Sequence, residues 1–141
     1  MKTATLALSA AVATVISWSA FAQEAAQTIS LQLNAAQPSE KGCRFTFVVN
    51  NGLGHDLEKA AYEIALFNDA GVVDRLSVLE FKDLPAGKTK VARFDLAGVD
   101  CAKTGRLLVN TATDCVGEGV DPGLCMKALK TESKTAIVFG V

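Results

Sequence analysis

The four cysteines of this 141-residue chain, Cys43, Cys101, Cys115 and Cys125, restrict its possible folds more than any other feature. Their even number suits two disulfide bonds if the chain folds in an oxidising compartment. Three pairings are possible, and we favour Cys43–Cys101 together with Cys115–Cys125. The second pair encloses a short loop rich in Gly and Pro that can turn tightly, and the first joins the start of one predicted strand to the segment that precedes another. We therefore expect a small domain held by two covalent cross-links.

The first 22 residues have the pattern of an export signal. A lysine follows the initiating methionine, and residues 3–22 carry no charge and are rich in Ala, Leu, Val and Ile. The run closes on an Ala-Phe-Ala segment that fits a signal-peptidase site. Its length is near that of a membrane span, so an uncleaved anchor is the alternative. We predict a signal peptide over residues 1–22 and one mature domain over residues 23–141, located in the periplasm or secreted.

Two other export routes are not indicated by the sequence. The N-terminal segment holds no Arg-Arg pair, so twin-arginine export is not favoured, and no cysteine follows the cleavage site to carry a lipid. After residue 22, no apolar stretch approaches the ~20 residues of a membrane-spanning helix. The sequence therefore predicts a mature domain without a membrane span.

The charge of the chain argues against two classes of partner. It has 14 Lys and Arg against 15 Asp and Glu, with a formal net charge of −1. Binding to nucleic acid or to an anionic membrane surface usually depends on a clear excess of positive charge. We therefore expect neither as a partner.

Seven short segments alternate apolar and polar residues, which is the pattern of strands with one buried face. In the clearest, residues 43–50, the side chains of Phe45, Phe47 and Val49 face the same way. Turn signals rich in Gly, Asn, Asp and Pro separate the segments. Asp121 followed by Pro122 predicts the start of a helix that runs to about residue 130. The predicted strands cover residues 28–34, 43–50, 61–68, 72–82, 89–96, 106–113 and 135–139.

This spacing predicts an all-β domain, namely an immunoglobulin-like antiparallel β-sandwich of about seven strands with one short helix in the C-terminal region. Helices do not alternate with the strands, which argues against a parallel α/β sheet. A small closed barrel is the main alternative.

Several short motifs resemble those of known extracytoplasmic proteins. The run Val-Val-Asn-Asn-Gly-Leu at 48–53, the amphipathic strand at 62–67 and the Leu-Pro-Ala-Gly turn at 84–87 are similar to bacterial immunoglobulin-like modules. The start of the Cys43 strand and the four-Cys layout resemble a group of uncharacterised alphaproteobacterial periplasmic proteins. The resemblance implies an extracytoplasmic compartment and an immunoglobulin-like fold, and it implies no activity.

Most candidate chemistries lack the residues that they need. Thiol–disulfide exchange usually depends on a Cys-x-x-Cys pair, which the chain lacks. His55 is the only histidine, and no Gly-x-Ser-x-Gly segment accompanies it, so nucleophilic hydrolysis is not indicated. A copper carrier would need clusters of His and Met, whereas Met126 is the only methionine after the signal. We expect no cofactor and no catalytic residue.

One weak candidate metal site remains. The acidic loop that holds Asp114, Glu118 and Asp121 could bind Ca²⁺ through carboxylate oxygens. It lacks the spacing of an EF-hand, and Asp121 has a competing role as a helix cap. The ordinary interpretation is a solvated loop.

A surface for a partner is the stronger candidate. Val48, Phe67 and Val78 fall on strand faces where polar residues are expected, which can mark a docking surface. The sequence favours an exported, non-enzymatic binding or structural module of the cell envelope, with another envelope protein as its partner. The alternative is a small-ligand or metal-ion carrier, or an enzyme, with a site on strand-end loops near residues 114–121.

Overall fold

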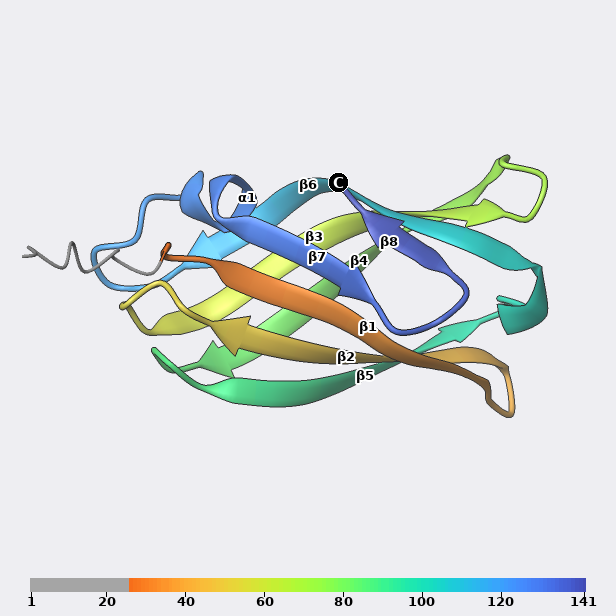
Figure 1. The fold of residues 1–141 in the computed structure, drawn as a ribbon, viewed down its shortest axis with the longest axis horizontal. Helices are drawn as coiled ribbons and strands as arrows, with labels where there is room; N and C mark the ends of the chain where they lie inside the picture. Colours follow the sequence, from red (N-terminus) through yellow and green to blue (C-terminus); the bar gives the residue numbers. More distant parts are fainter. Residues whose placement is uncertain (1–25) are drawn as a thin grey trace, which may run out of the picture.

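The computed structural model describes residues 26–141, and the predicted signal peptide lies outside this range. Two four-stranded sheets pack face to face as a β-sandwich (Figure 1). The all-β sandwich predicted from the alternating segments is therefore confirmed. The chain does not form the alternative closed barrel, because the strands divide into two separate sheets.

The strands divide between two sheets, which we call sheet A and sheet B. Sheet A contains, in spatial order, β5 (Thr89–Ala97), β2 (Gly42–Asn51), β1 (Ile29–Pro38) and β7 (Leu129–Ser133). Sheet B contains β4 (Val73–Leu84), β3 (Leu57–Asn68), β6 (Thr104–Val116) and β8 (Val138–Gly140). A 3-10 turn, η1 (Cys101–Lys103), precedes β6, and a one-turn helix, α1 (Leu124–Lys127), follows it.

Two of the strand pairings differ from the fully antiparallel arrangement that the sequence predicted. Strand β7 runs parallel to β1, and β8 runs parallel to β6, whereas the other pairings are antiparallel. Residues 134–137 both reverse the chain and carry it from sheet A to sheet B (Figure 1). The last two strands therefore close one edge of each sheet.

The predicted helix is shorter than expected. Helix α1 ends at Lys127 instead of about residue 130, and β7, a strand that the sequence did not predict, covers Leu129–Ser133. The free edge of β1 accounts for the difference, because it pairs with β7 from Leu129 to Ser133 and long-range pairing overrides weak local helix preference. The predicted cap is also wrong, because α1 begins at Leu124 with Gly123 as its N-cap and without a side-chain cap. Asp121 lies in the preceding turn, where its Oδ1 accepts a 2.7 Å hydrogen bond from the Gly123 N–H.

The core lies between the two sheets and is closed by both disulfides. Phe47 occupies its centre, with its ring making edge contacts at centroid distances of 5.5 to 6.0 Å with Phe81, Phe94 and Phe139. The favoured pairing is confirmed: Cys43–Cys101 joins β2 to η1, and Cys115–Cys125 joins β6 to α1. No helix within residues 26–141 is both long and apolar enough to cross a membrane.

Candidate interaction surface

The structure does not assemble the weak calcium candidate. Asp114 Oδ2 lies 3.4 Å from Lys59 Nζ, and Asp121 Oδ1 is used by the Gly123 N–H. Glu118 lies apart from both and lines an open recess with His55. Within residues 26–141, no three His, Cys, Asp or Glu side chains are placed to hold a metal ion together.

The strand-end loops near this segment form an open recess at one end of the sandwich. Loop residues on either side of His55 and Asp56 meet the loop at Glu118 there. The Asp56 carboxylate accepts a 2.8 Å hydrogen bond from the Ala86 N–H, so it ties two loops together. Every buried side-chain nitrogen or oxygen of residues 26–141 has a hydrogen-bond partner. The recess therefore contains no unpartnered buried polar side chain that could bind a ligand.

The two deeply buried polar side chains both have structural partners. Asn51 is fully buried and donates 2.7 Å hydrogen bonds to the carbonyls of Leu84 and His55. The Tyr62 hydroxyl donates a 3.0 Å hydrogen bond to the Cys125 carbonyl. Burial raises the pKa of Tyr62 above its ordinary value, because the interior disfavours a phenolate. Neither group is available for acid–base chemistry at neutral pH.

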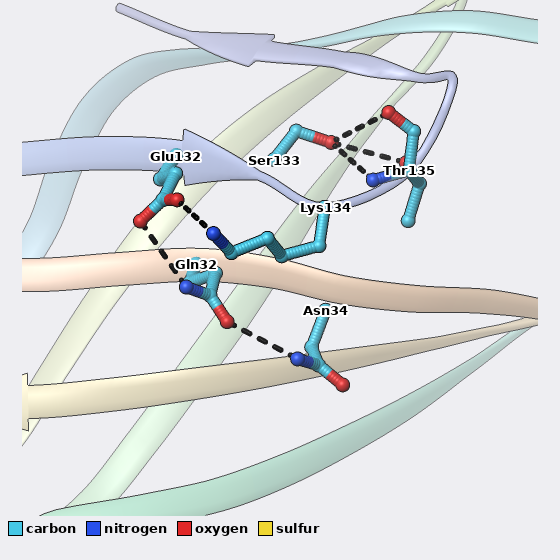
Figure 2. A network of polar contacts seen from close by, with 6 residues as sticks. All are labelled: Gln32, Asn34, Glu132, Ser133, Lys134 and Thr135. Carbon is cyan, nitrogen blue, oxygen red and sulfur yellow. Dashed lines mark hydrogen bonds and ion pairs between the residues drawn. The ribbon is translucent and has the colours of Figure 1, made fainter.

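The outer face of sheet A is mostly polar and carries two ion pairs. Arg44 Nε lies 3.0 Å from Asp95 Oδ1, and the hydrogen bond from Arg44 lowers the pKa of Asp95. On β7, at the other edge of the sheet, Glu132 accepts hydrogen bonds from Gln32 at 3.1 Å and from Lys134 at 2.6 Å (Figure 2). The contact with Lys134, followed by that with Gln32, lowers the pKa of Glu132. Such a surface suits contact with water.

The network in Figure 2 also fixes the turn between the two sheets. Ser133 Oγ accepts a 3.1 Å hydrogen bond from the Thr135 N–H and donates one of 2.6 Å to the Ile137 carbonyl. The Thr135 hydroxyl accepts in turn from the Ile137 N–H at 3.0 Å. These bonds hold residues 134–137 so that β8 reaches the edge of sheet B.

One end of the outer face of sheet B is apolar, and the other end carries the ion pairs Lys59–Asp114 and Lys82–Glu80. Leu79 and Phe81 point into the core, so strand alternation directs Leu76 and Val78 of β4 outward. The same argument from buried neighbours places residues of β3, β6 and β8 on this side. We call the set the apolar face, and it consists of Ala65, Phe67, Val73, Leu76, Val78, Leu108 and Val138.

The apolar face crosses all four strands in register. One row contains Leu76, Ala65, Leu108 and Gly140, which are neighbours from β4 to β8. The adjacent row contains Val73, Phe67, Arg106 and Val138. Leu76, Val73, Val78 and Val138 are each more than half exposed. Scattered apolar residues are ordinary on a protein surface, whereas a contiguous patch marks an interaction site.

Two of the three apolar residues singled out from the sequence lie on this face, namely Phe67 and Val78. Val48 lies on the outer face of sheet A, where it pairs with Val91 among polar neighbours. Sequence analysis missed Leu76 and Val138. The apolar side of β4 was hard to recognise because the pairing of β3 and β4 shifts between Leu66 and Phe67. The alternation of residues before the buried pair Leu79 and Phe81 could have indicated that Leu76 faces outward.

Comparison with known proteins gives no relative. The chain matches no protein-family model, no curated protein and no solved structure.

Proposed function

We propose that this chain is an exported, non-enzymatic module of the cell envelope, located in the periplasm or secreted, that binds a protein partner through the apolar face. The observation that carries the proposal is the contrast between the two outer faces. Sheet A exposes two ion pairs, with Val91 as its one largely exposed aliphatic side chain, whereas one end of sheet B exposes aliphatic side chains from both of its edge strands, such as Leu76 and Val138. Covering an exposed aliphatic side chain contributes on the order of 1 kcal/mol, so several together can support a stable contact.

The covalent structure supports an extracytoplasmic location. Both cysteine pairs of the described domain are oxidised, and disulfides persist in oxidising compartments. The charge-free N-terminal run with its Ala-Phe-Ala end supports export by the general route.

The strand order supports an immunoglobulin-like type of sandwich. The sequence β8-β6-β3-β4 across sheet B corresponds to the order G-F-C-C′ of variable-type immunoglobulin domains. The chain also crosses between the sheets after β2, β4 and β5, as Greek-key connections do. The parallel pairing of β8 departs from that arrangement.

Site-specific photocross-linking in intact cells tests the proposal. A photoreactive amino acid replaces Val78 on the apolar face in one strain and Thr46, on the outer face of sheet A, in a matched control strain. We expect a discrete cross-linked protein product from position 78 and none from position 46. Equal labelling at the two positions, or no product at position 78, would overturn the assignment of the face.

A further inference from the structure

We infer that the occupant of the apolar face is a second copy of this chain, related by a two-fold axis that runs along the strands between β3 and β6. The inference rests on the proposed function and names its partner. A two-fold contact joins the same surface of both copies, so the surface must be complementary to itself. The register of sheet B provides this complementarity.

The central row of the face alternates large and small side chains. From β4 to β8 it reads Leu76, Ala65, Leu108 and Gly140. The proposed axis exchanges β3 with β6 and β4 with β8 of the second copy. Leu108 of each copy then lies over Ala65 of the other, and Leu76 lies over Gly140, where a Cβ atom would have no neighbour within 4 Å. Each large side chain of this row therefore lies over a small residue of the other copy, with open space at Gly140 and an alanine that its own chain already covers at Ala65.

The adjacent row is complementary about the same axis. Val73 of each copy faces Val138 of the other, which buries two exposed valines together. Arg106 faces the Phe67 ring of the other copy. Within its own chain, the Arg106 guanidinium already lies 5.6 Å from the centroid of the Phe67 ring. Arginine commonly stacks on aromatic faces, so a charged side chain is compatible with this apolar surface.

The remaining charges of the face also agree with this axis. Strand pairing places Glu63 beside Thr111, Asp114 beside Ala61 and Lys59 beside Val116, so the axis puts these three charges opposite uncharged residues of the second copy. Glu80 and Lys82 of β4 lie in rows that β8 does not reach. A two-fold axis perpendicular to the strands would instead place Leu108 over Leu108 and leave Ala65 facing Ala65. The arrangement of large and small residues thus selects the axis along the strands.

The size of the face is sufficient for a dimer. Strands β4, β3 and β6 have 12, 12 and 13 residues, whereas β8 has 3. At about 4.8 Å between strands and about 3.3 Å per residue, the three long strands cover roughly 600 Å². This area is close to the ~600 Å² per partner at the lower end of specific, stable interfaces. Sheets packed face to face keep their strand directions within about 30° of each other. The residue rows of the two copies therefore lie over one another near the centre of the interface.

Sedimentation equilibrium of the purified, oxidised mature chain tests the inference. We expect a reversible monomer–dimer equilibrium. Val138→Asp should weaken dimerisation at least tenfold, because a carboxylate would be buried against Val73 of the second copy. Val91→Asp is the matched control, since Val91 is 59% exposed on the outer face of sheet A and Val138 is 60% exposed. The control should leave the dimer unchanged.

A second variant tests the predicted fit. Gly140→Leu should weaken the dimer by filling the space that Leu76 of the second copy occupies, and a Cβ atom at this position meets no neighbouring atom within 4 Å in its own chain. Circular dichroism and thermal melts confirm that each variant is folded. A chain that stays monomeric at millimolar concentration, or a dimer equally sensitive to Val91→Asp and Val138→Asp, would overturn the inference.

The outcomes separate this inference from the proposed function. A monomeric chain that cross-links in cells to a different protein from position 78 overturns the inference and supports the function. A dimer that Val138→Asp weakens, together with no product at position 78 in cells, supports the inference and overturns the function. A cross-linked product of twice the mass of the chain supports both.

Discussion

Asn51 Nδ2 lies 2.7 Å from the carbonyl oxygen of Leu84, and this hydrogen bond joins the end of a strand in sheet A to the end of a strand in sheet B. The same amide donates to the His55 carbonyl, and its oxygen accepts from the Leu53 N–H at 3.0 Å. One buried side chain therefore fixes the loops at this end of the sandwich.

Asn51→Asp should destabilise the domain by about 3 kcal/mol or more at pH 7, because a buried carboxylate would face two carbonyl oxygens. The loss should shrink at acidic pH, where a protonated carboxyl can donate again. Urea unfolding at several pH values measures it. Asn50→Asp is the control, since Asn50 contacts the Thr89 hydroxyl at the surface, and it should cost less than about 1 kcal/mol. Equal losses for the two variants would contradict the assigned role.

Tyr62 predicts the response of the protein to alkaline pH. Burial raises the pKa of Tyr62 in the folded state. In the unfolded chain, the tyrosine pKa has its ordinary value of about 10, so below that pH the phenol is neutral in both states. Above that pH the unfolded state ionises and the folded state does not. The free energy of unfolding should therefore fall by about 1.4 kcal/mol per pH unit through this group.

The measurement is direct because Tyr62 is the only tyrosine of the chain. Absorbance near 295 nm should show no phenolate in the native protein at pH 10.5 and should rise only with unfolding. Tyr62→Phe should remove this contribution to the pH dependence and cost about 1 to 2 kcal/mol at neutral pH, because the Cys125 carbonyl loses its partner. A native chain that titrates near pH 10 while folded would contradict the burial of this hydroxyl.

The two disulfides should differ in their contribution to stability. They close loops with sequence separations of 58 and 10 residues. The chain-entropy model then gives about 4 kcal/mol for Cys43–Cys101 and about 3 kcal/mol for Cys115–Cys125. Guanidinium unfolding of the paired Cys→Ala variants measures both. We expect the Cys43/Cys101 variant to be the less stable, and the reverse order would indicate that local packing outweighs loop length.

Lys90 protects an edge of sheet B. Its Nζ donates to the carbonyls of Lys82 and Asp83 at 2.8 and 3.0 Å, and it reaches from β5 across the open side of the sandwich. Edge strands with free backbone groups template aggregation, and lysines commonly prevent it. Lys90→Met should therefore increase aggregation after mild heating, as measured by light scattering. Lys88→Met, which changes the net charge equally, is the control and should aggregate as the unchanged chain does.

The sequence indicated the strands for which local patterns are unambiguous. In residues 43–50 every second side chain is apolar, and β2 covers this segment with those side chains buried. The pairing Cys115–Cys125 followed from the short flexible loop between the two cysteines. In both cases the necessary information lies within about ten residues, which is the range over which side-chain alternation and loop length act.

Only the tertiary structure decided the elements that depend on distant partners. The sequence predicts the end of a helix at residues 129–130 and no element at residues 131–133, whereas all five residues form a strand because the edge of β1 offers hydrogen bonds to them. The apolar face likewise arises from four strands spread between residues 57 and 140, and its rows exist only once β4, β3, β6 and β8 are placed in register. The chain's own pattern determines which side of a strand is apolar. Strand neighbours, fixed by long-range hydrogen bonds, determine whether those sides combine into a surface.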